Sequence, residues 1–187
     1  MKRQAQKGFS LLELMFGIGI SLFVAGVSIA MWRVSQDRAN ANASVNDFGR
    51  IRGEIGRIYN TTAQEGYVAL SAIALRSRGA DLEDLWVPAQ SNYRVGASIT
   101  TIGPGNRVPG GTGNPGDSFQ ITIQAAKPQA CTQIMMVAIR DAVHAVITDQ
   151  GGQAINITGL PGAAAQDQVQ QACNRPPSVR IQMDFNQ

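Results

Sequence analysis

Glu13 is the side chain in this sequence most in need of a partner. It is the one ionisable residue in an apolar run of twenty-three residues, Phe9 to Met31, that contains no proline. A charge near the middle of a lipid bilayer costs at least about 2.5–3.5 kcal/mol, and such residues are usually paired and functional. The sequence therefore predicts a paired carboxylate inside a membrane segment.

Cys131, Cys173 and His144 are the other candidates for chemistry. A metal site needs more ligands than two distant thiols and one imidazole supply, so no metal or other cofactor is expected. His144 lies in an apolar run predicted to be helical, which favours a structural role over catalysis. No serine lies in a nucleophile-elbow sequence. The chain is therefore predicted not to be an enzyme.

The apolar run is long enough to span a membrane as one helix. At about 1.5 Å per residue it would measure roughly 34 Å, enough to cross the hydrocarbon core. Lys2, Arg3 and Lys7 precede it, and basic residues on the short side favour the cytoplasm. A secretory signal peptide would have a shorter core and a small-residue cleavage site, whereas this run continues into Trp32-Arg33 and further helical sequence. The following domain is therefore predicted to be exported.

Export decides the expected state of the two cysteines. An even number of cysteines in an oxidising compartment suggests one disulfide, Cys131–Cys173. Closing a loop of about 43 residues would stabilise the fold by roughly 4 kcal/mol in the chain-entropy model.

Charge composition gives no indication of a nucleic-acid partner. The chain has 16 basic and 13 acidic residues, a net charge of +3, but three of the basic residues lie within the first eight. No basic cluster interleaved with aromatic residues follows.

Helical periodicity continues beyond the apolar run, over residues 33–60. Arg50, Glu54 and Arg57 share one side, and Arg50–Glu54 and Glu54–Arg57 have ion-pair spacing. The opposite side carries an apolar stripe, which we expect to pack on a globular head. The stripe recurs at steps of three or four residues: Val45, Phe48, Ile51 or Arg52, Ile55 and Ile58.

Residues 61–117 are predicted to connect this helix to the rest of the head. Short helices are expected at Tyr67–Arg76 and Asp81–Val87. The acidic residues of the second lack the ligand spacing of a calcium loop and are interpreted as a solvated turn. Alternation over Tyr93–Ile99 predicts one strand. The Gly- and Pro-rich stretch Gly103–Asp117 predicts a flexible exposed loop.

The C-terminal part alternates strands with helices. Apolar residues alternate with polar ones in Phe119–Ile123 and Val179–Phe185, and a short strand is expected at Ala154–Thr158. Helices are predicted at Cys131–Ile147 and Ala163–Cys173. Such strands predict an antiparallel sheet with one wet face and one face on the long helix. The expected fold class is therefore α+β.

Gly8, Phe9 and Glu13 together resemble the start of type IV pilin precursors. That family has a short basic leader, a glycine, and then an apolar helix with glutamate at its fifth position. The resemblance implies that a prepilin peptidase of the membrane cleaves after Gly8 and that Phe9 is N-methylated. It also implies that Glu13 of one copy neutralises the new amine of a neighbouring copy during assembly.

The resemblance also implies an organisation and a function. The expected parts are a leader at 1–8, a membrane and assembly helix at 9–32, an amphipathic continuation at 33–62 and a globular head at 63–187. The type IV pilin fold places the long helix on an antiparallel sheet. The cysteine-bearing C-terminal region is similar to type IVb pilins, although the short leader and Phe9 differ from that subclass.

The expected function is that of a filament subunit for adhesion, aggregation, motility or conjugative contact. Its implied partners are further copies of itself, the peptidase and inner-membrane assembly machinery. It would lie in the bacterial inner membrane before assembly and in an extracellular pilus afterwards. Two alternatives remain open: a pseudopilin of type II secretion, and a membrane-anchored binding module that does not polymerise.

Overall fold

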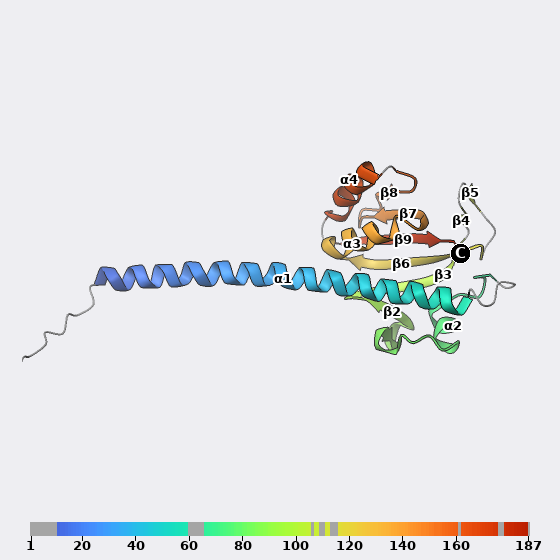
Figure 1. Ribbon diagram of the computed structural model, residues 1–187, viewed down its shortest axis with the longest axis horizontal. Helices are drawn as coiled ribbons and strands as arrows, with labels where there is room; N and C mark the ends of the chain where they lie inside the picture. Colours follow the sequence, from blue (N-terminus) through green and yellow to red (C-terminus); the bar gives the residue numbers. More distant parts are fainter. Residues whose placement is uncertain are drawn as a thin grey trace, which may run out of the picture. The chain divides into compact units, whose positions relative to one another are not determined.

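The computed structural model describes residues 11–59, 66–105, 107–108, 111–112, 116–160, 162–175 and 178–186. The chain divides into two compact units between Arg38 and Ala39, within the first helix. The first unit is the N-terminal part of that helix. The second unit is an α+β head (Figure 1).

Helix α1 runs from Leu11 to Tyr59, and its part from Ala39 onward, nearly six turns at about 3.6 residues per turn, belongs to the head. The predicted apolar stripe is confirmed, because Phe48, Ile51, Ile55 and Ile58 are all buried there. In the head, Phe48 packs against Phe185 with the ring centroids 6.0 Å apart. Burial of this stripe, rather than intrinsic helix propensity, supplies most of the stability of such a helix segment.

The described strands of the head form a seven-stranded antiparallel sheet in the order β1-β2-β3-β6-β9-β7-β8. The C-terminal strand β9 therefore lies in the interior of the sheet, between β6 and β7. The strands are β1 (Trp86–Val87), β2 (Asn92–Val95), β3 (Ser98–Gly105), β6 (Ser118–Ala126), β7 (Ala142–Thr148), β8 (Ala154–Asn156) and β9 (Val179–Phe185). The predicted α+β class with an antiparallel sheet is confirmed.

Short helices complete the head. They are α2 (Ala72–Ser77), α3 (Pro128–Ala138), α4 (Gly162–Cys173) and the 3-10 turns η2 (Glu83–Leu85) and η3 (Pro88–Gln90). Pro128 occupies the first turn of α3, where its missing N–H costs nothing. The predicted helix at Ala163–Cys173 is confirmed as α4.

The helix predicted over Cys131–Ile147 is wrong in its second half. Helix α3 ends at Ala138, and residues from Ala142 form strand β7. Within β7, Ala145 and Ile147 are buried while Val146 between them is only half-buried, which is strand alternation. Both β9 and β8 pair with this strand, so tertiary pairing overrides a pattern that also fits a helix.

The single strand predicted at Tyr93–Ile99 is instead a hairpin. Strand β2 ends at Val95, and β3 begins at Ser98 and pairs back with it. Gly96 has φ +59° in the turn, and a Cβ there would collide with the Ser44 hydroxyl of α1. The turn therefore needs glycine because it adopts a left-handed conformation and because it touches α1.

The exposed loop predicted at Gly103–Asp117 is also partly wrong. Strand β3 continues to Gly105, and β4 (Arg107–Val108) pairs with β5 (Gly111–Thr112). Gly116 is buried, donates its N–H to the Gly105 carbonyl at 2.8 Å and accepts from the Tyr67 N–H at 2.9 Å. At Gly105 and Gly116 two backbone segments approach each other closely, so these two glycines do not mark a solvated loop.

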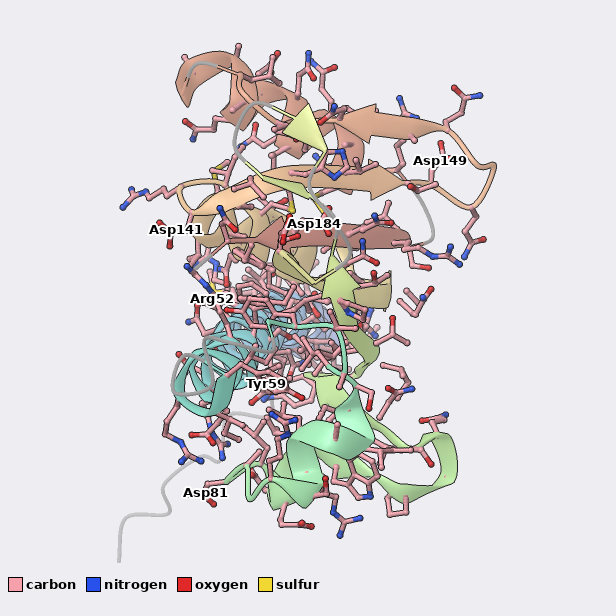
Figure 2. The ribbon with its side chains drawn as sticks, turned by 90° about the vertical axis from the view of Figure 1, so that its right-hand side faces the viewer. Arg52, Tyr59, Asp81, Asp141, Asp149 and Asp184 are labelled. Atoms are coloured by element: carbon pink, nitrogen blue, oxygen red, sulfur yellow. A yellow bond between two sulfur atoms is a disulfide. The ribbon has the colours of Figure 1, made fainter. Side chains whose placement is uncertain are left out.

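The core of the head joins α1 to the C-terminal strand. The Phe119 and Phe185 rings stack at 5.3 Å, and the guanidinium of Arg52 lies 4.7 Å from the Phe185 ring centre. Arg52 also pairs with Asp141 at 2.7 Å, and Figure 2 shows the two side chains together beside α1. The arginine thus covers the end of the apolar core with its flat face and places its charge at the surface.

Candidate functional site

The N-terminal part of α1 presents an apolar surface that the described residues leave uncovered. Its large hydrophobic side chains from Leu11 to Val34 are between 40% and 79% exposed. The helix has an 18-residue window of mean hydropathy 2.2, none of it buried, so it is long and apolar enough to cross a membrane. Such a surface needs lipid or another apolar partner, because exposed patches of this extent are rare on soluble monomers.

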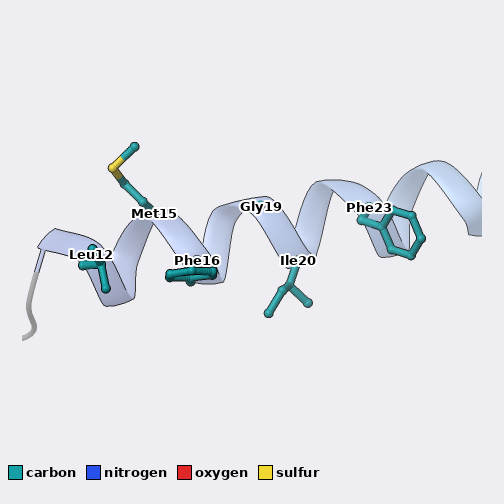
Figure 3. Close-up of a pocket in the computed structure, with 6 residues that line it drawn as sticks. All are labelled: Leu12, Met15, Phe16, Gly19, Ile20 and Phe23. Carbon is teal, nitrogen blue, oxygen red and sulfur yellow. The ribbon is translucent and has the colours of Figure 1, made fainter.

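A shallow apolar hollow interrupts this surface around Gly19 (Figure 3). Gly19 lacks a side chain, so the floor of the hollow lies at the level of the helix backbone. A small residue at such a point lets another helix approach closely in a membrane. Six residues line the hollow: Leu12, Met15, Phe16, Gly19, Ile20 and Phe23.

The predicted processing residues are not brought together by the structure. Gly8 and Phe9 lie outside the described residues. Glu13 belongs to α1, but its side chain is not among those described. Their roles therefore stay predictions from the sequence.

The comparison with known families bears on these same residues. Residues 3–29 match the family model for the prokaryotic N-terminal methylation motif. No curated protein matches the chain. The motif, together with the exposed apolar helix, supports a type IV pilin-like or pseudopilin precursor that is anchored in the membrane before assembly. It implies processing by a prepilin peptidase and assembly into a filament.

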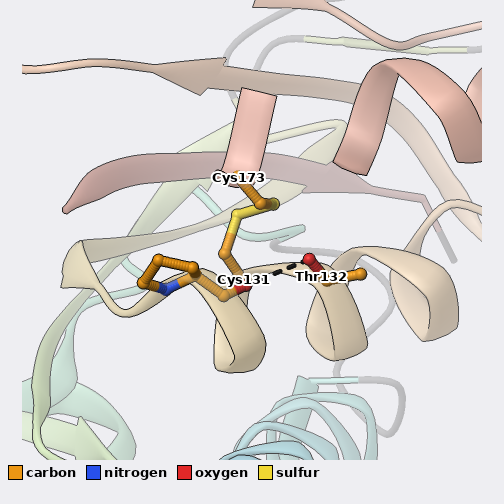
Figure 4. The surroundings of a disulfide bond; sticks show 4 residues. Cys131, Thr132 and Cys173 are labelled. Carbon is orange, nitrogen blue, oxygen red and sulfur yellow. Dashed lines mark hydrogen bonds between the residues drawn. A yellow bond between two sulfur atoms is a disulfide. The ribbon is translucent and has the colours of Figure 1, made fainter. Parts of the chain in front are cut away.

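The predicted disulfide is present in the head. Cys131 of α3 and Cys173, the last residue of α4, are bonded with their Cα atoms 5.6 Å apart (Figure 4). Both cysteines are completely buried. The two helices contact each other, so the bond joins elements that already pack together. Thr132, next to Cys131, donates its hydroxyl to the Pro128 carbonyl at 3.0 Å and so uses its polar group within α3.

The polar side of α1 binds the segment that the sequence interprets as a solvated acidic turn. Of the two predicted ion pairs, Glu54–Arg57 forms at 2.6 Å, while Arg50 pairs with Asp84 at 2.7 Å instead of with Glu54. Glu54 also accepts the Asp81 N–H at 3.2 Å. The hydrogen bond from Arg57 lowers the pKa of Glu54, and that from Arg50 lowers the pKa of Asp84. The turn is therefore docked on α1 by charge.

His144 lies in strand β7, not in the helix predicted for it, and its ring contacts a buried acid. Its Nδ1 is 3.0 Å from Oδ2 of Asp184, a residue only 1% exposed. The amide of Gln120 donates to Oδ1 of Asp184 at 2.9 Å. The expected structural role of the histidine thus has a specific partner, which sequence reasoning missed. Asp184 falls on the polar side of the alternation in β9, and the sequence predicts that side to be wet.

The described residues contain no group of three or more His, Cys, Asp or Glu side chains arranged to hold a metal ion. The candidate site is therefore the N-terminal helix itself, a surface for insertion and association.

Proposed function

We propose that this protein is the structural subunit of a type IV pilus. In this proposal the prepilin peptidase cleaves after Gly8, the new N-terminus at Phe9 is methylated, and the subunits polymerise through α1 into a surface filament. The observation that carries the proposal is the methylation motif at residues 3–29 on a helix that is long and apolar enough to cross a membrane.

Glu13 has a defined task in this proposal. Cleavage leaves an ammonium group on Phe9 within apolar surroundings, and a buried charge without a partner is costly. A carboxylate from the adjacent copy would pair with that amine as the subunits stack. Each charge then disfavours the isolated subunit and favours the assembled one.

The head supports the pilus over the type II secretion pseudopilin as the destination. A buried disulfide suits a domain exposed to an oxidising exterior. A major pseudopilin is usually smaller and has no such bridge. The C-terminal bridge also favours the type IVb subclass, and the partners would be further copies, the peptidase and the inner-membrane assembly machinery.

The experiment that tests the proposal combines a processing block with imaging of the cell surface. Gly8→Ala should abolish the mobility shift that cleavage produces and should remove filaments that an antibody to the head labels in sheared material. Gly162→Ala makes the same chemical change in the head, at the exposed first residue of α4 with open space around it, and should leave both readouts unchanged.

Two outcomes would contradict the proposal. Labelled filaments from an uncleaved Gly8→Ala chain would contradict the processing step. A processed wild-type protein retained in the periplasm would favour the pseudopilin.

A further inference from the structure

Asp184 is a fully buried carboxylate at the centre of the sheet. It lies on β9, and its two donors stand directly opposite it on the neighbouring strands, Gln120 on β6 and His144 on β7. The distances are 2.9 Å from the Gln120 amide and 3.0 Å from the His144 ring. The three side chains thus form one row across three strands, on the face opposite the apolar residues of β9 (Figure 2 labels Asp184).

The apolar pattern of β9 does not by itself specify one register. Val179, Ile181, Met183 and Phe185 are all buried and recur every second residue. A shift by one residue would reverse the two faces of the strand and is excluded by this pattern. A shift by two residues keeps apolar side chains on the inner face. It would move Phe185 away from the Phe48 and Phe119 rings, so packing opposes the shift and any polar preference adds to it.

The contacts of the Asp184 carboxylate do discriminate against a shift by two residues. In one direction Asp184 would take the place of Gln182, opposite Thr122 and Val146. Val146 donates no hydrogen bond and Thr122 has a single hydroxyl donor, while the contacts with His144 and Gln120 would both be lost. In the other direction Asp184 would lie opposite Ser118 and again leave both donors behind. Either shift would move the carboxylate to the half-buried place of Gln182 or Asn186 and would take the acceptor away from the Gln120 and His144 side chains, a loss that costs stability.

Strand β3 closes over the carboxylate and makes the position more selective. A Cβ at Gly105 would lie 3.1 Å from Oδ1 of Asp184 and would overlap the Ser118 hydroxyl. The backbone of Gly105 therefore helps to exclude water from the acid. This contact with Gly105 belongs to the register in which Asp184 lies opposite Gln120.

We propose that the row of Gln120, Asp184 and His144 specifies the register of the C-terminal strand. Strand β9 is the last element of the chain, yet it inserts between β6 and β7, where two edges must accept it at once. In the native register, Asp184 contacts one side chain on each neighbouring strand, Gln120 on β6 and His144 on β7. This inference is independent of the proposed filament role.

Disulfide trapping across β7 and β9 in the full chain, in detergent, tests the proposal. Arg180→Cys with Thr148→Cys reports the native register, because these residues are paired. Gln182→Cys with Thr148→Cys reports one shifted register, and Arg180→Cys with Val146→Cys reports the other. Diagonal neighbours lie roughly 7–8 Å apart, too far to bridge unless the strand moves. Peptide mapping by mass spectrometry separates these bonds from the native one.

Each pair of cysteines is combined with Asp184→Leu, Asp184→Asn or the control Met183→Ala. The control removes buried packing from the same strand and leaves the row intact. We expect the ratio of shifted to native bridges to rise at least tenfold with either change at Asp184 and to stay at the wild-type value with Met183→Ala. Exclusively native bridges in folded Asp184→Asn protein would overturn the proposal, whether or not Asp184→Leu folds. An equal rise with Met183→Ala would also overturn it, since general destabilisation would then explain the shift.

Discussion

At the scale of single residues, the proposed assembly chemistry depends on Glu13. Its neighbours Leu12 and Leu14 are 66% and 56% exposed. We expect the partner of the carboxylate on another copy, in keeping with the filament assembly that the motif implies. In the proposed filament that partner is the amine at Phe9 of the next copy.

Glu13→Gln should permit membrane insertion and cleavage but should reduce entry into filaments. Glutamine keeps the size of the side chain and removes the charge, which leaves the amine of the neighbouring copy unpaired at a cost of roughly 3–5 kcal/mol. The measurement compares the cleaved fraction in membranes with the yield of sheared filaments. Normal filament yield from fully cleaved Glu13→Gln protein would contradict the charge pairing.

Tyr93 illustrates a residue whose polar group costs stability. Its side chain is buried, and its hydroxyl finds no hydrogen-bond partner among the described residues. Burial, assisted by the nearby Glu83 carboxylate, raises the pKa of Tyr93 to about 12. The head therefore favours the neutral phenol over the phenolate.

Tyr93→Phe should leave the head equally stable or more stable by about 1 kcal/mol at neutral pH, because it removes a buried unpaired hydroxyl. Because the pKa of wild-type Tyr93 is raised in the fold, the head keeps its full stability below about pH 10, where the phenol is neutral in the folded and unfolded states. The stability falls as the pH rises from about 10 toward 12, because the unfolded chain ionises more readily. Urea unfolding at several alkaline pH values measures this loss, which should be smaller in Tyr93→Phe. Identical alkaline profiles would count against the burial argument.

At the scale of elements, the N-terminal and C-terminal parts of α1 differ in their side-chain pattern. Its N-terminal part shows apolar side chains all round and suits lipid or other helices. From Ala41 onward it buries one stripe and uses Arg50, Glu54 and Arg57 on another side to hold the segment at residues 79–84. The change occurs without a break in the helix.

The disulfide is the element-scale feature with the clearest expected magnitude. Replacing both cysteines, Cys131→Ser with Cys173→Ser, should lower the free energy of unfolding by about 4 kcal/mol in the chain-entropy model. Because the bond ties α4 to α3, we expect protease to cut first between these helices. The readouts are denaturant unfolding and limited proteolysis, with reduced wild-type protein as the matched control. Equal protease resistance with and without the bond would remove its assigned role.

At the scale of the whole molecule, the two units differ in how much of their apolar surface is buried. The described part of unit 2 contains the sheet, the disulfide and a contiguous buried core. Unit 1 carries the uncovered apolar surface. Association with membranes or other copies is therefore expected to reside in the first unit.

Removing residues 1–38 should leave a head that folds, forms its disulfide and is monomeric without detergent. The reason is that the buried core belongs to residues from Ala41 onward. Circular dichroism and sedimentation compare this fragment with the full chain, which should require detergent. Aggregation of a natively folded fragment would indicate that the head itself contains an association surface.

Much of this organisation could be predicted from local sequence. Periodicity identifies the apolar helix and the buried stripe of α1, and alternation identifies β6 and β9, because each signal depends only on near neighbours. Export and an even cysteine count predict the disulfide. The assignment of Gly8 and Phe9 as processing residues is a prediction from the motif alone.

Other features depend on partners far apart in the sequence. Residues 142–148 fit either a helix or a strand, and pairing with β9 selects the strand. The glycines near residues 96, 105 and 116 resemble loop signals, yet they mark places where backbones touch. Asp184 follows a polar alternation that predicts a wet face, and only the arrival of β3, β6 and β7 around it makes it buried. Local patterns determine which faces are apolar, whereas tertiary packing decides which polar groups lose their water.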